Sequence, residues 1–219
     1  MAADSAPENT VGRLSLYRRI LEDLRRDGKR SVYSHELAIL AAGTAAQVRR
    51  DIMTIGHSGS PSRGYGVADL IESIEVFLDG PTGQSVVVVG AGNLGRAIMA
   101  YVGSRRRKLT IVAAFDADPA KTDRVVQGVR CYSIERLPDV VREQGVRVGV
   151  IAVPGGESQA VASMLVQAGI RGILNFAPVR LRVPPWVYVE DLDVTTSLEK
   201  VAYFARMSRK EKDGWHGTP

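Results

Sequence analysis

Residues 85–95 have the sequence SVVVVGAGNLG, in which an apolar β-branched run leads directly into three spaced glycines. The valines predict a buried strand of a parallel sheet, and the residues from Arg96 to about Val102 predict a helix. G-x-G-x-x-G between a strand and a helix is the dinucleotide-binding fingerprint. Its glycines permit a tight turn, close backbone approach to a pyrophosphate, and close helix–strand packing. We therefore expect a dinucleotide to contact Gly90, Ala91, Gly92, Asn93, Leu94 and Gly95.

A second predicted strand, residues 109–115, ends at Asp116, which lies 21 residues beyond Gly95. An acid at this position can hold both hydroxyls of the adenosine ribose and repels a 2′-phosphate, which favours NAD(H) over NADP(H). Further strands are expected at residues 147–153, 172–176 and 186–190. Ligands of open α/β sheets bind beyond the carboxyl ends of the strands. Val153 and Pro154 therefore join Asp116 in the candidate nucleotide site.

The chain up to about Leu78 predicts helices, and a turn-rich linker at residues 79–83 separates it from the sheet. Apolar residues at helical spacing predict a first helix from about Gly12 to Arg26. The face expected to be buried carries Leu14, Tyr17, Leu21 and Leu24, and the opposite face Arg18, Glu22, Arg25 and Arg26. A second helix is expected to begin near Ser34 as its N-cap, and Gly43 ends it. Thr44 begins a third helix with a sequence, TAAQ, that fits a capping box.

A short helix, a glycine turn and a helix with exposed Gln and Arg near its start predict a helix-turn-helix. Arg can bind guanine and Gln can bind adenine through paired hydrogen bonds in the major groove. The glycine-rich loop at residues 56–66 is typical of a wing that lies along DNA. The candidate DNA-binding residues are Ser34, Thr44, Gln47, Arg49, Arg50, Ser58, Arg63, Gly64 and Tyr65. The alternative is a three-helix domain whose basic face is only solvated.

Composition narrows the function classes. The chain has 219 residues, a net charge of +5, 45% hydrophobic residues, one cysteine and three histidines. The single cysteine excludes a disulfide framework and a cysteine-type zinc site. No histidine lies between Ser58 and Trp215, so a dehydrogenase would lack a usual proton donor, and we expect no catalytic residues and no enzyme. Without an apolar run of ~18 residues or a signal peptide, we expect a cytoplasmic protein with no membrane partner.

From about Arg13 to Met207, the chain resembles the Rex family of bacterial redox-sensing transcriptional repressors. The resemblance rests on QVRRD at residues 47–51, the glycine loop, FDADP at 115–119, GIRGILNFAP at 169–178 and EDLD at 190–193. It implies a homodimer in which residues 1–80 form a winged helix-turn-helix and residues 81–194 a Rossmann-type, doubly wound parallel sheet. Residues 195–219 would form a C-terminal helix and tail swapped between subunits.

The resemblance also implies a function. NADH favours a dimer that releases double-stranded, inverted-repeat operator DNA, whereas NAD⁺ or the free protein favours the DNA-bound form. It places Tyr101 near the nicotinamide, Asp193 near the nicotinamide of a neighbouring site, and Arg19 as an ionic partner of Asp193.

The chain departs from the family pattern at three places. Ser60-Pro61-Ser62-Arg63 replaces the basic pair and glycines that usually precede Gly-Tyr in the wing. Ser197 stands at a position that is often acidic, and Val194 is smaller than the usual residue. Two other functions fit the sheet: a small NAD-dependent oxidoreductase and a CoA-binding module. Neither accounts for residues 12–66.

Overall fold

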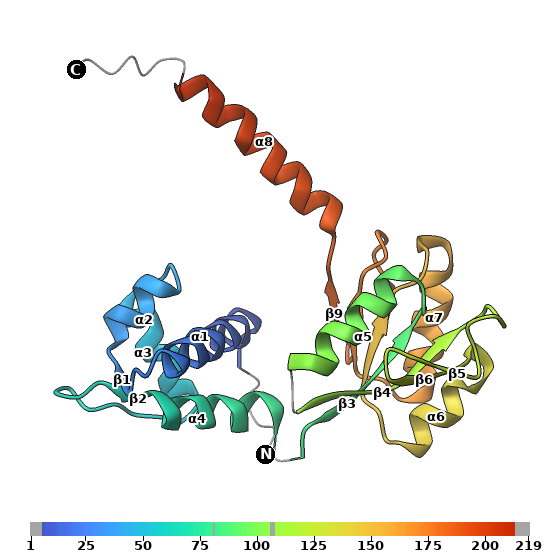
Figure 1. The fold of residues 1–219 in the computed structure, drawn as a ribbon, viewed down its shortest axis with the longest axis horizontal. Coiled ribbons are helices and arrows are strands. Elements are labelled where there is room, and N and C mark those ends of the chain that lie inside the picture. The colour runs from blue at the N-terminus through green and yellow to red at the C-terminus, as the bar shows by residue number, and fades with distance from the viewer. Residues whose placement is uncertain (1–5, 81, 106–107, 213–219) are drawn as a thin grey trace. The chain divides into compact units, whose positions relative to one another are not determined.

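The computed structural model describes residues 6–80, 82–105 and 108–212. Its contacts divide the chain into two compact units, Met1–Gly83 and Gln84–Pro219, called the helical unit and the sheet unit below (Figure 1). The division falls three residues after the expected boundary at residue 80 and keeps the last helix with the sheet unit. A separate swapped segment at residues 195–219 stays a prediction.

The helical unit is a winged helix. Its helices are α1 (Glu8–Arg26), α2 (Ser34–Leu40), α3 (Ala45–Thr54) and α4 (Val67–Asp79). Strands β1 (Ser31–Val32) and β2 (Tyr65–Gly66) pair antiparallel at the base of the wing. Leu14, Tyr17 and Leu21 are buried on α1, as their spacing predicts, and they join Val48 and Ile52 of α3 in one core. Burial of these apolar side chains fixes α3 against α1.

The prediction that Arg18 lies on the outer face of α1 is wrong. Arg18 is only 5% exposed, and its Nη1 donates to Oδ2 of Asp79 at 2.7 Å. Asp79 is the last residue of α4, and α1 packs along α4. A second helix therefore covers a face of α1 that its own apolar spacing does not reveal. The Arg18 Nε finds no hydrogen-bond partner among the described residues.

The sheet unit contains a seven-stranded sheet in the order β5-β6-β4-β3-β7-β8-β9. All neighbouring strands run parallel except β5 and β6. The strands are β3 (Gln84–Val89), β4 (Leu109–Asp116), β5 (Arg124–Val126), β6 (Val129–Ser133), β7 (Val148–Ile151), β8 (Gly172–Asn175) and β9 (Tyr188–Asp191). The helices are α5 (Asn93–Arg105), α6 (Leu137–Glu143), α7 (Gly155–Ala168) and α8 (Val194–Lys212), with a 3-10 turn η1 (Ile134–Arg136).

Strand β3 lies at the centre of a doubly wound sheet. Its valines alternate between two cores, with Val87 and Val89 in one and Val86 and Val88 in the other. The chain continues from β3 to β4 on one side and later adds β7 on the other, so the strand order reverses at β3. Ligands of such sheets bind at this switch point, beyond the carboxyl ends of the strands.

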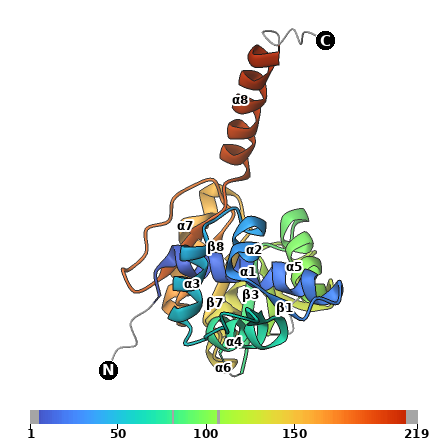
Figure 2. The same cartoon turned by 90° about the vertical axis from the view of Figure 1, so that its left-hand side faces the viewer.

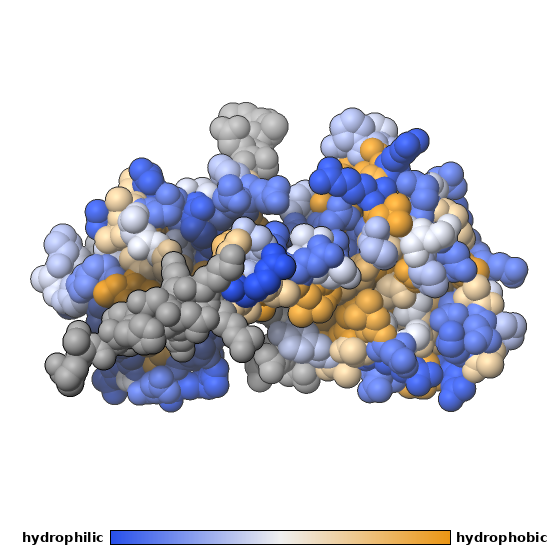
Figure 3. All heavy atoms as spheres, turned by 90° about the horizontal axis from the view of Figure 1, so that it is seen from above, coloured by the Kyte–Doolittle hydropathy of each residue, from blue (hydrophilic) through white to orange (hydrophobic). Residues whose placement is uncertain are grey.

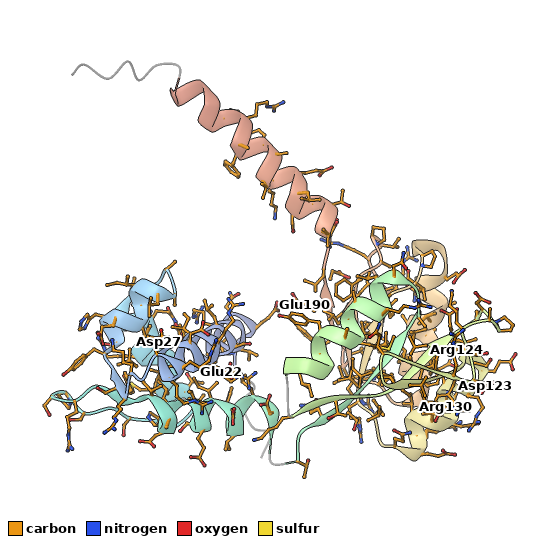
Figure 4. The ribbon with its side chains drawn as sticks, in the orientation of Figure 1. Glu22, Asp27, Asp123, Arg124, Arg130 and Glu190 are labelled. Atoms are coloured by element: carbon orange, nitrogen blue, oxygen red, sulfur yellow. The ribbon has the colours of Figure 1, made fainter. Side chains whose placement is uncertain are left out.

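Several features of the sheet unit differ from the sequence prediction. Helix α5 begins at Asn93, three residues before the expected Arg96. Strand β7 ends at Ile151, so Val153 and Pro154 lie in the loop that follows it. The hairpin β5–β6 was not predicted, because its strands are only three and five residues long and each contains an arginine. Arg130 and Asp123, labelled in Figure 4, form an ion pair of 3.7 Å beside this hairpin.

Helix α8 projects away from the sheet in both ribbon views (Figures 1 and 2). It begins at Val194, two residues before the expected Thr196. Its residues from Val194 to Met207 are all exposed, and they include Leu198, Val201 and Phe204. Hydrophobic side chains also interrupt the hydrophilic surface of the sheet unit seen from above (Figure 3). Within the described residues, no helix is long and apolar enough to cross a membrane.

Candidate functional site

The glycine loop joins β3 to α5 at the switch point. Gly90 has a φ of 101°, and a Cβ there would overlap the carbonyl oxygen of Ala152. A Cβ on Gly95 would overlap the carbonyl oxygen of Gly90. These positions therefore need glycine for the turn and for helix–strand packing, as predicted. A Cβ on Gly92 would meet no atom within 4 Å, so the protein itself does not require glycine there. The role of Gly92 toward a pyrophosphate stays a prediction.

Asp116 is held beside this loop by backbone hydrogen bonds. The Ala91 N–H donates to its Oδ2 at 2.8 Å, and the Asp118 N–H donates to its Oδ1 at 2.9 Å. The Lys121 Nζ lies 3.5 Å from Asp116 Oδ2 and 3.4 Å from Asp118 Oδ2. The charge of Asp116 is the main cause that raises the pKa of Lys121. A carboxylate fixed at the end of β4 can accept hydrogen bonds from ribose hydroxyls.

A cavity of about 430 Å³ opens at this edge of the sheet. Of the predicted nucleotide-binding residues, it is lined by Gly90, Gly92, Asp116, Val153 and Pro154. Asn93 and Leu94 are exposed at the start of α5, Gly95 is buried, and Tyr101 is 59% exposed further along this helix. The structure brings none of these four to the cavity lining. Together, the glycine loop and the fixed carboxylate make this cavity suited to a dinucleotide.

Sequence reasoning missed several lining residues of this cavity. They are Val89, Ala117, Asp118, Lys121, Ile134, Ala152, Glu157 and Val161. Ligands of such sheets bind beyond the carboxyl ends of the strands, which could have indicated Lys121 after β4. The same rule would have indicated Ile134 if strand β6 had been predicted. No group of three or more His, Cys, Asp or Glu in the described part of the chain could hold a metal ion.

Asp193 lies at a second cavity, of about 250 Å³, between the loop after β8 and the start of α8. Arg180 and Asp191 also line it. The Thr196 N–H donates to Asp193 Oδ1 at 3.0 Å, and the Thr196 hydroxyl donates to Oδ2 at 2.6 Å. These hydrogen bonds lower the pKa of Asp193. Asp193 thus caps α8 in an ionised form, and the structure does not bring it to the first cavity.

In the helical unit, the N-cap of α2 differs from the prediction, whereas Thr44 is the N-cap of α3 as predicted. Tyr33, not Ser34, is the N-cap of α2, and its N–H donates to Glu36 Oε2 at 2.7 Å. Thr44 caps α3 by accepting from the Gln47 N–H at 3.2 Å. The Gln47 side chain does not complete the capping box, because it bonds to other residues of α3.

The exposed side chains at the start of α3 are held by single bonds. Arg49 Nη1 donates to the Ser34 hydroxyl at 3.1 Å, which links α3 to α2. Arg50 Nη2 donates to Gln47 Oε1 at 2.9 Å. Both arginines are exposed, whereas Gln47 is half-buried. Arg49 and Arg50 can therefore exchange these bonds for contacts with a DNA base or phosphate.

Sequence reasoning missed a buried carboxylate on this helix, that of Asp51. Asp51 Oδ2 accepts from Arg13 Nε at 2.6 Å and from the Tyr17 hydroxyl at 2.9 Å. Its Oδ1 accepts from Arg13 Nη2 at 2.8 Å and from Gln47 Nε2 at 2.9 Å. Burial opposes ionisation, but these hydrogen bonds outweigh it and lower the pKa of Asp51. Burial and the bond to Asp51 raise the pKa of Tyr17 to about 12.

The wing follows α3. Ser58 and Arg63 are exposed on it, and Gly64 has a φ of 70°, which favours glycine. Tyr65 is only 9% exposed and pairs with Val32 across the small sheet. Its ring therefore anchors the wing to the core and does not lie on the surface expected to face DNA.

Comparisons with known proteins agree with both units. A family model described as a CoA binding domain matches residues 82–179, and one described as a putative DNA-binding protein N-terminus matches residues 5–52. The redox-sensing transcriptional repressor Rex of Carboxydothermus hydrogenoformans is 43% identical over 91% of this chain and 96% of its own. The chain belongs to the Rex family. Rex of Roseiflexus sp. is 38% identical over 99% of this chain and 97% of its own.

Solved structures of a Rex-family repressor, RSP, have the same fold. RSP has a TM-score of 0.86 at 28% identity, over 96% of this chain and 100% of its own. Its complex with β-NADH has a TM-score of 0.84 over 97% of this chain and 100% of its own. Its complex with β-NAD⁺ and operator DNA has a TM-score of 0.85 over 98% of this chain and 100% of its own. Both have 28% identity to this Rex-family chain.

Proposed function

We propose that this chain is a transcriptional repressor that binds operator DNA through its helical unit and releases it when NADH binds the sheet unit. The observation that carries the proposal is the anchored Asp116 beside the glycine loop, in a chain that also carries a winged helix with exposed arginines on α3. The complexes of RSP with NADH, and with NAD⁺ and operator DNA, support the same cofactors and partner.

The nucleotide would bind along the edge formed by β4, β3 and β7. Gly92 would allow the pyrophosphate to approach the backbone at the start of α5, where the helix dipole favours negative charge. Asp116 would accept both adenosine ribose hydroxyls, because backbone hydrogen bonds already fix its two oxygens. Its charge would repel the 2′-phosphate of NADP(H), although Lys121 weakens that repulsion. The NADH/NAD⁺ ratio would act through differential affinity for two shapes of the protein.

The DNA contacts would come from α3 and the wing. Arg49 and Arg50 would reach bases or phosphates in the major groove. Ser34 and Thr44, at the starts of α2 and α3, would lie beside the DNA backbone, and Arg63 would reach it from the wing. We further infer a homodimer, since the apolar residues of α8 are exposed in a single chain and inverted-repeat operators match two-fold symmetry.

CoA is a second candidate ligand, because the matching family model of the sheet unit is described as a CoA binding domain. CoA carries a phosphate on its adenosine ribose, which the anchored carboxylate of Asp116 would repel. We therefore favour NAD(H). Direct competition between CoA and NADH for the protein separates the two.

The decisive experiment is a fluorescence anisotropy titration of labelled inverted-repeat DNA with the full chain. Salt is held fixed, because phosphate contacts make affinity strongly salt-dependent. NADH should release the DNA, whereas NAD⁺ and CoA should not. Arg49→Ala and Arg50→Ala should each weaken DNA binding by roughly tenfold and spare NADH binding. Arg142→Ala, which removes an exposed ion pair on α6, is the matched control.

If CoA releases the DNA and NADH does not, CoA would replace NADH as the assigned ligand. Wild-type affinity in both arginine variants would remove α3 as the recognition helix. If neither the inverted repeat nor a selection from genomic fragments yields bound DNA, the repressor function itself fails.

A further inference from the structure

The wing of this chain is a closed loop at its tip. The Ser60 N–H donates to the Gly64 carbonyl at 2.9 Å, and the Gly64 N–H donates back to the Ser60 carbonyl at 2.7 Å. The Arg63 N–H also bonds to the Ser60 carbonyl, at 3.3 Å. The hydroxyls of Ser60 and Ser62 lie 3.1 Å apart. Arg63 is the one cation in the loop at residues 56–66, so its position decides how the wing attracts phosphate.

Tyr33, which lies outside the wing, fastens this tip to the start of α2. Its hydroxyl donates to the Ser62 carbonyl at 2.8 Å. Its ring lies against Gly64, since a Cβ on Gly64 would come within 3.2 Å of Tyr33 Cδ1. The Tyr33 ring also stacks on the His35 ring, with a centroid distance of 5.6 Å and an interplanar angle of 19°. Tyr33 thus holds the tip of the wing by one hydrogen bond and by ring packing.

Tyr33 is itself fixed in place. The Tyr33 N–H donates to Glu36 Oε2 at 2.7 Å, and Glu36 Oε1 accepts from Lys29 Nζ at 2.7 Å. The hydrogen bond and the charge of Lys29 lower the pKa of Glu36, which keeps this carboxylate ionised. A series of bonds therefore runs from Lys29 through Glu36 and Tyr33 to the wing tip, and all of its members belong to the helical unit.

We propose that Tyr33 is a positioning residue that holds the wing in the shape in which Arg63 contacts the DNA backbone. A loop that is already ordered loses less conformational entropy on binding than a free loop does. This matters most here, because Arg63 is the one Lys or Arg of residues 56–66. The inference rests on the proposed function, because it assigns a residue to DNA binding.

A direct contact between Tyr33 and DNA is the competing explanation, because the Tyr33 side chain is 38% exposed. The two explanations differ in their dependence on Arg63. A positioning residue acts through the group that it positions, so removing Arg63 should remove the effect of Tyr33. A direct contact should act independently, and the two effects on affinity should then add.

The test is a double-mutant cycle in the full chain. Tyr33→Phe keeps the ring and removes only the hydroxyl that holds Ser62. Operator affinity should fall by about 3- to 10-fold in Tyr33→Phe, in line with the loss of one hydrogen bond. Arg63→Ala should weaken binding more, and adding Tyr33→Phe to it should change affinity less than twofold. Tyr188→Phe, which removes a hydroxyl bonded to Glu190 in the sheet unit, is the matched control.

Amide hydrogen exchange supplies a readout that does not need DNA. The Gly64 amide is bonded within the tip, so it should exchange several-fold faster in Tyr33→Phe, while the melting temperature and the NADH affinity stay at wild-type values. Unchanged exchange would overturn the clamp whether or not the protein binds DNA. Unchanged operator affinity in Tyr33→Phe, or additive effects with Arg63→Ala, would overturn the positioning role. Absence of DNA binding by the wild-type chain would instead refute the proposed function.

Discussion

Replacing Asp51 by Asn should destabilise the helical unit by about 3 kcal/mol. The Asp51 side chain is only 2% exposed, and each of its two oxygens accepts two hydrogen bonds. Asn has the same shape, but one oxygen becomes an amide that donates. In either orientation of the Asn amide, its NH₂ group faces two hydrogen-bond donors that the carboxylate oxygen had accepted from. A buried group left unsatisfied costs about 1–3 kcal/mol, and the lost ion pair adds to this cost. Arg13 is one-third exposed and can turn to water, which limits the total.

The assay is thermal and urea unfolding of the full chain followed by circular dichroism. For a unit of this size, ~3 kcal/mol corresponds to a loss of roughly 12–24 °C in its melting temperature. Asp139→Asn is the control, because it breaks an exposed ion pair with Arg142 and should change stability by less than about 0.5 kcal/mol. A loss below about 1 kcal/mol in Asp51→Asn, or a loss equal to that of Asp139→Asn, would refute the reasoning.

Unfolding at acid pH should reveal the contribution of the Asp51 carboxylate to stability. The pKa of Asp51 is lower in the folded protein than its ordinary value, because hydrogen bonds from Arg13, Gln47 and Tyr17 outweigh burial. Its contribution to stability is therefore present above the unfolded pKa of about 3.9 and is lost as pH falls through the folded value. Wild type should lose stability below about pH 4 more steeply than Asp51→Asn. Parallel curves for the two proteins would contradict this assignment.

Gly92→Ala should keep wild-type stability and lower NADH affinity at least about tenfold, since its Cβ meets only open space. Gly95→Ala should lose more than about 2 kcal/mol of stability, because its Cβ would overlap a backbone oxygen. A wild-type melting temperature in Gly95→Ala, or a lowered one in Gly92→Ala, would contradict the respective prediction. Asp116→Ala should narrow the preference for NADH over NADPH, measured by fluorescence titration; an unchanged ratio would remove its ribose role. Because the pKa of Tyr17 is raised from 10.0 to about 12, its contribution is present below pH 10 and lost toward pH 12. Urea unfolding should show a loss of about 2–3 kcal/mol over this range, which Tyr17→Phe should remove.

The glycine loop was predictable because its requirements are local. A positive φ at Gly90 and the close approach of Gly95 to the preceding turn depend on neighbours in sequence. Asp116 was predictable from its fixed distance beyond that loop, and the structure places it against Ala91. The apolar spacing of α1 likewise identified Leu14, Tyr17 and Leu21 as core residues. Each of these inferences needs only the regular geometry of one or two elements.

The ion pairs of the helical unit were not predictable in the same way. Arg13 and Asp51 are 38 residues apart, and Arg18 and Asp79 are 61 residues apart. On a single helix, each of these residues has the pattern of a solvated charge. Only the packing of α1 against α3 and α4 brings the partners together and buries Asp51 and Arg18. Strands β5 and β6 were missed because they are short and each contains an arginine, although Val126, Val129 and Cys131 are buried in a core of the sheet unit.

The buried carboxylate also changes the interpretation of α3. From the sequence alone, Gln47, Arg49 and Arg50 are equally good candidates for contacts with DNA bases. In the structure, the Gln47 amide donates to Asp51, which is buried and ionised, whereas Arg49 and Arg50 donate to uncharged acceptors, the Ser34 hydroxyl and the Gln47 side-chain oxygen. A hydrogen bond to a charged acceptor is stronger than one to a neutral group, so Gln47 gives up its partner less readily on binding DNA. Arg49 and Arg50 are therefore free to contact bases or phosphates, while Gln47 ties the start of α3 to Asp51 and, through it, to α1.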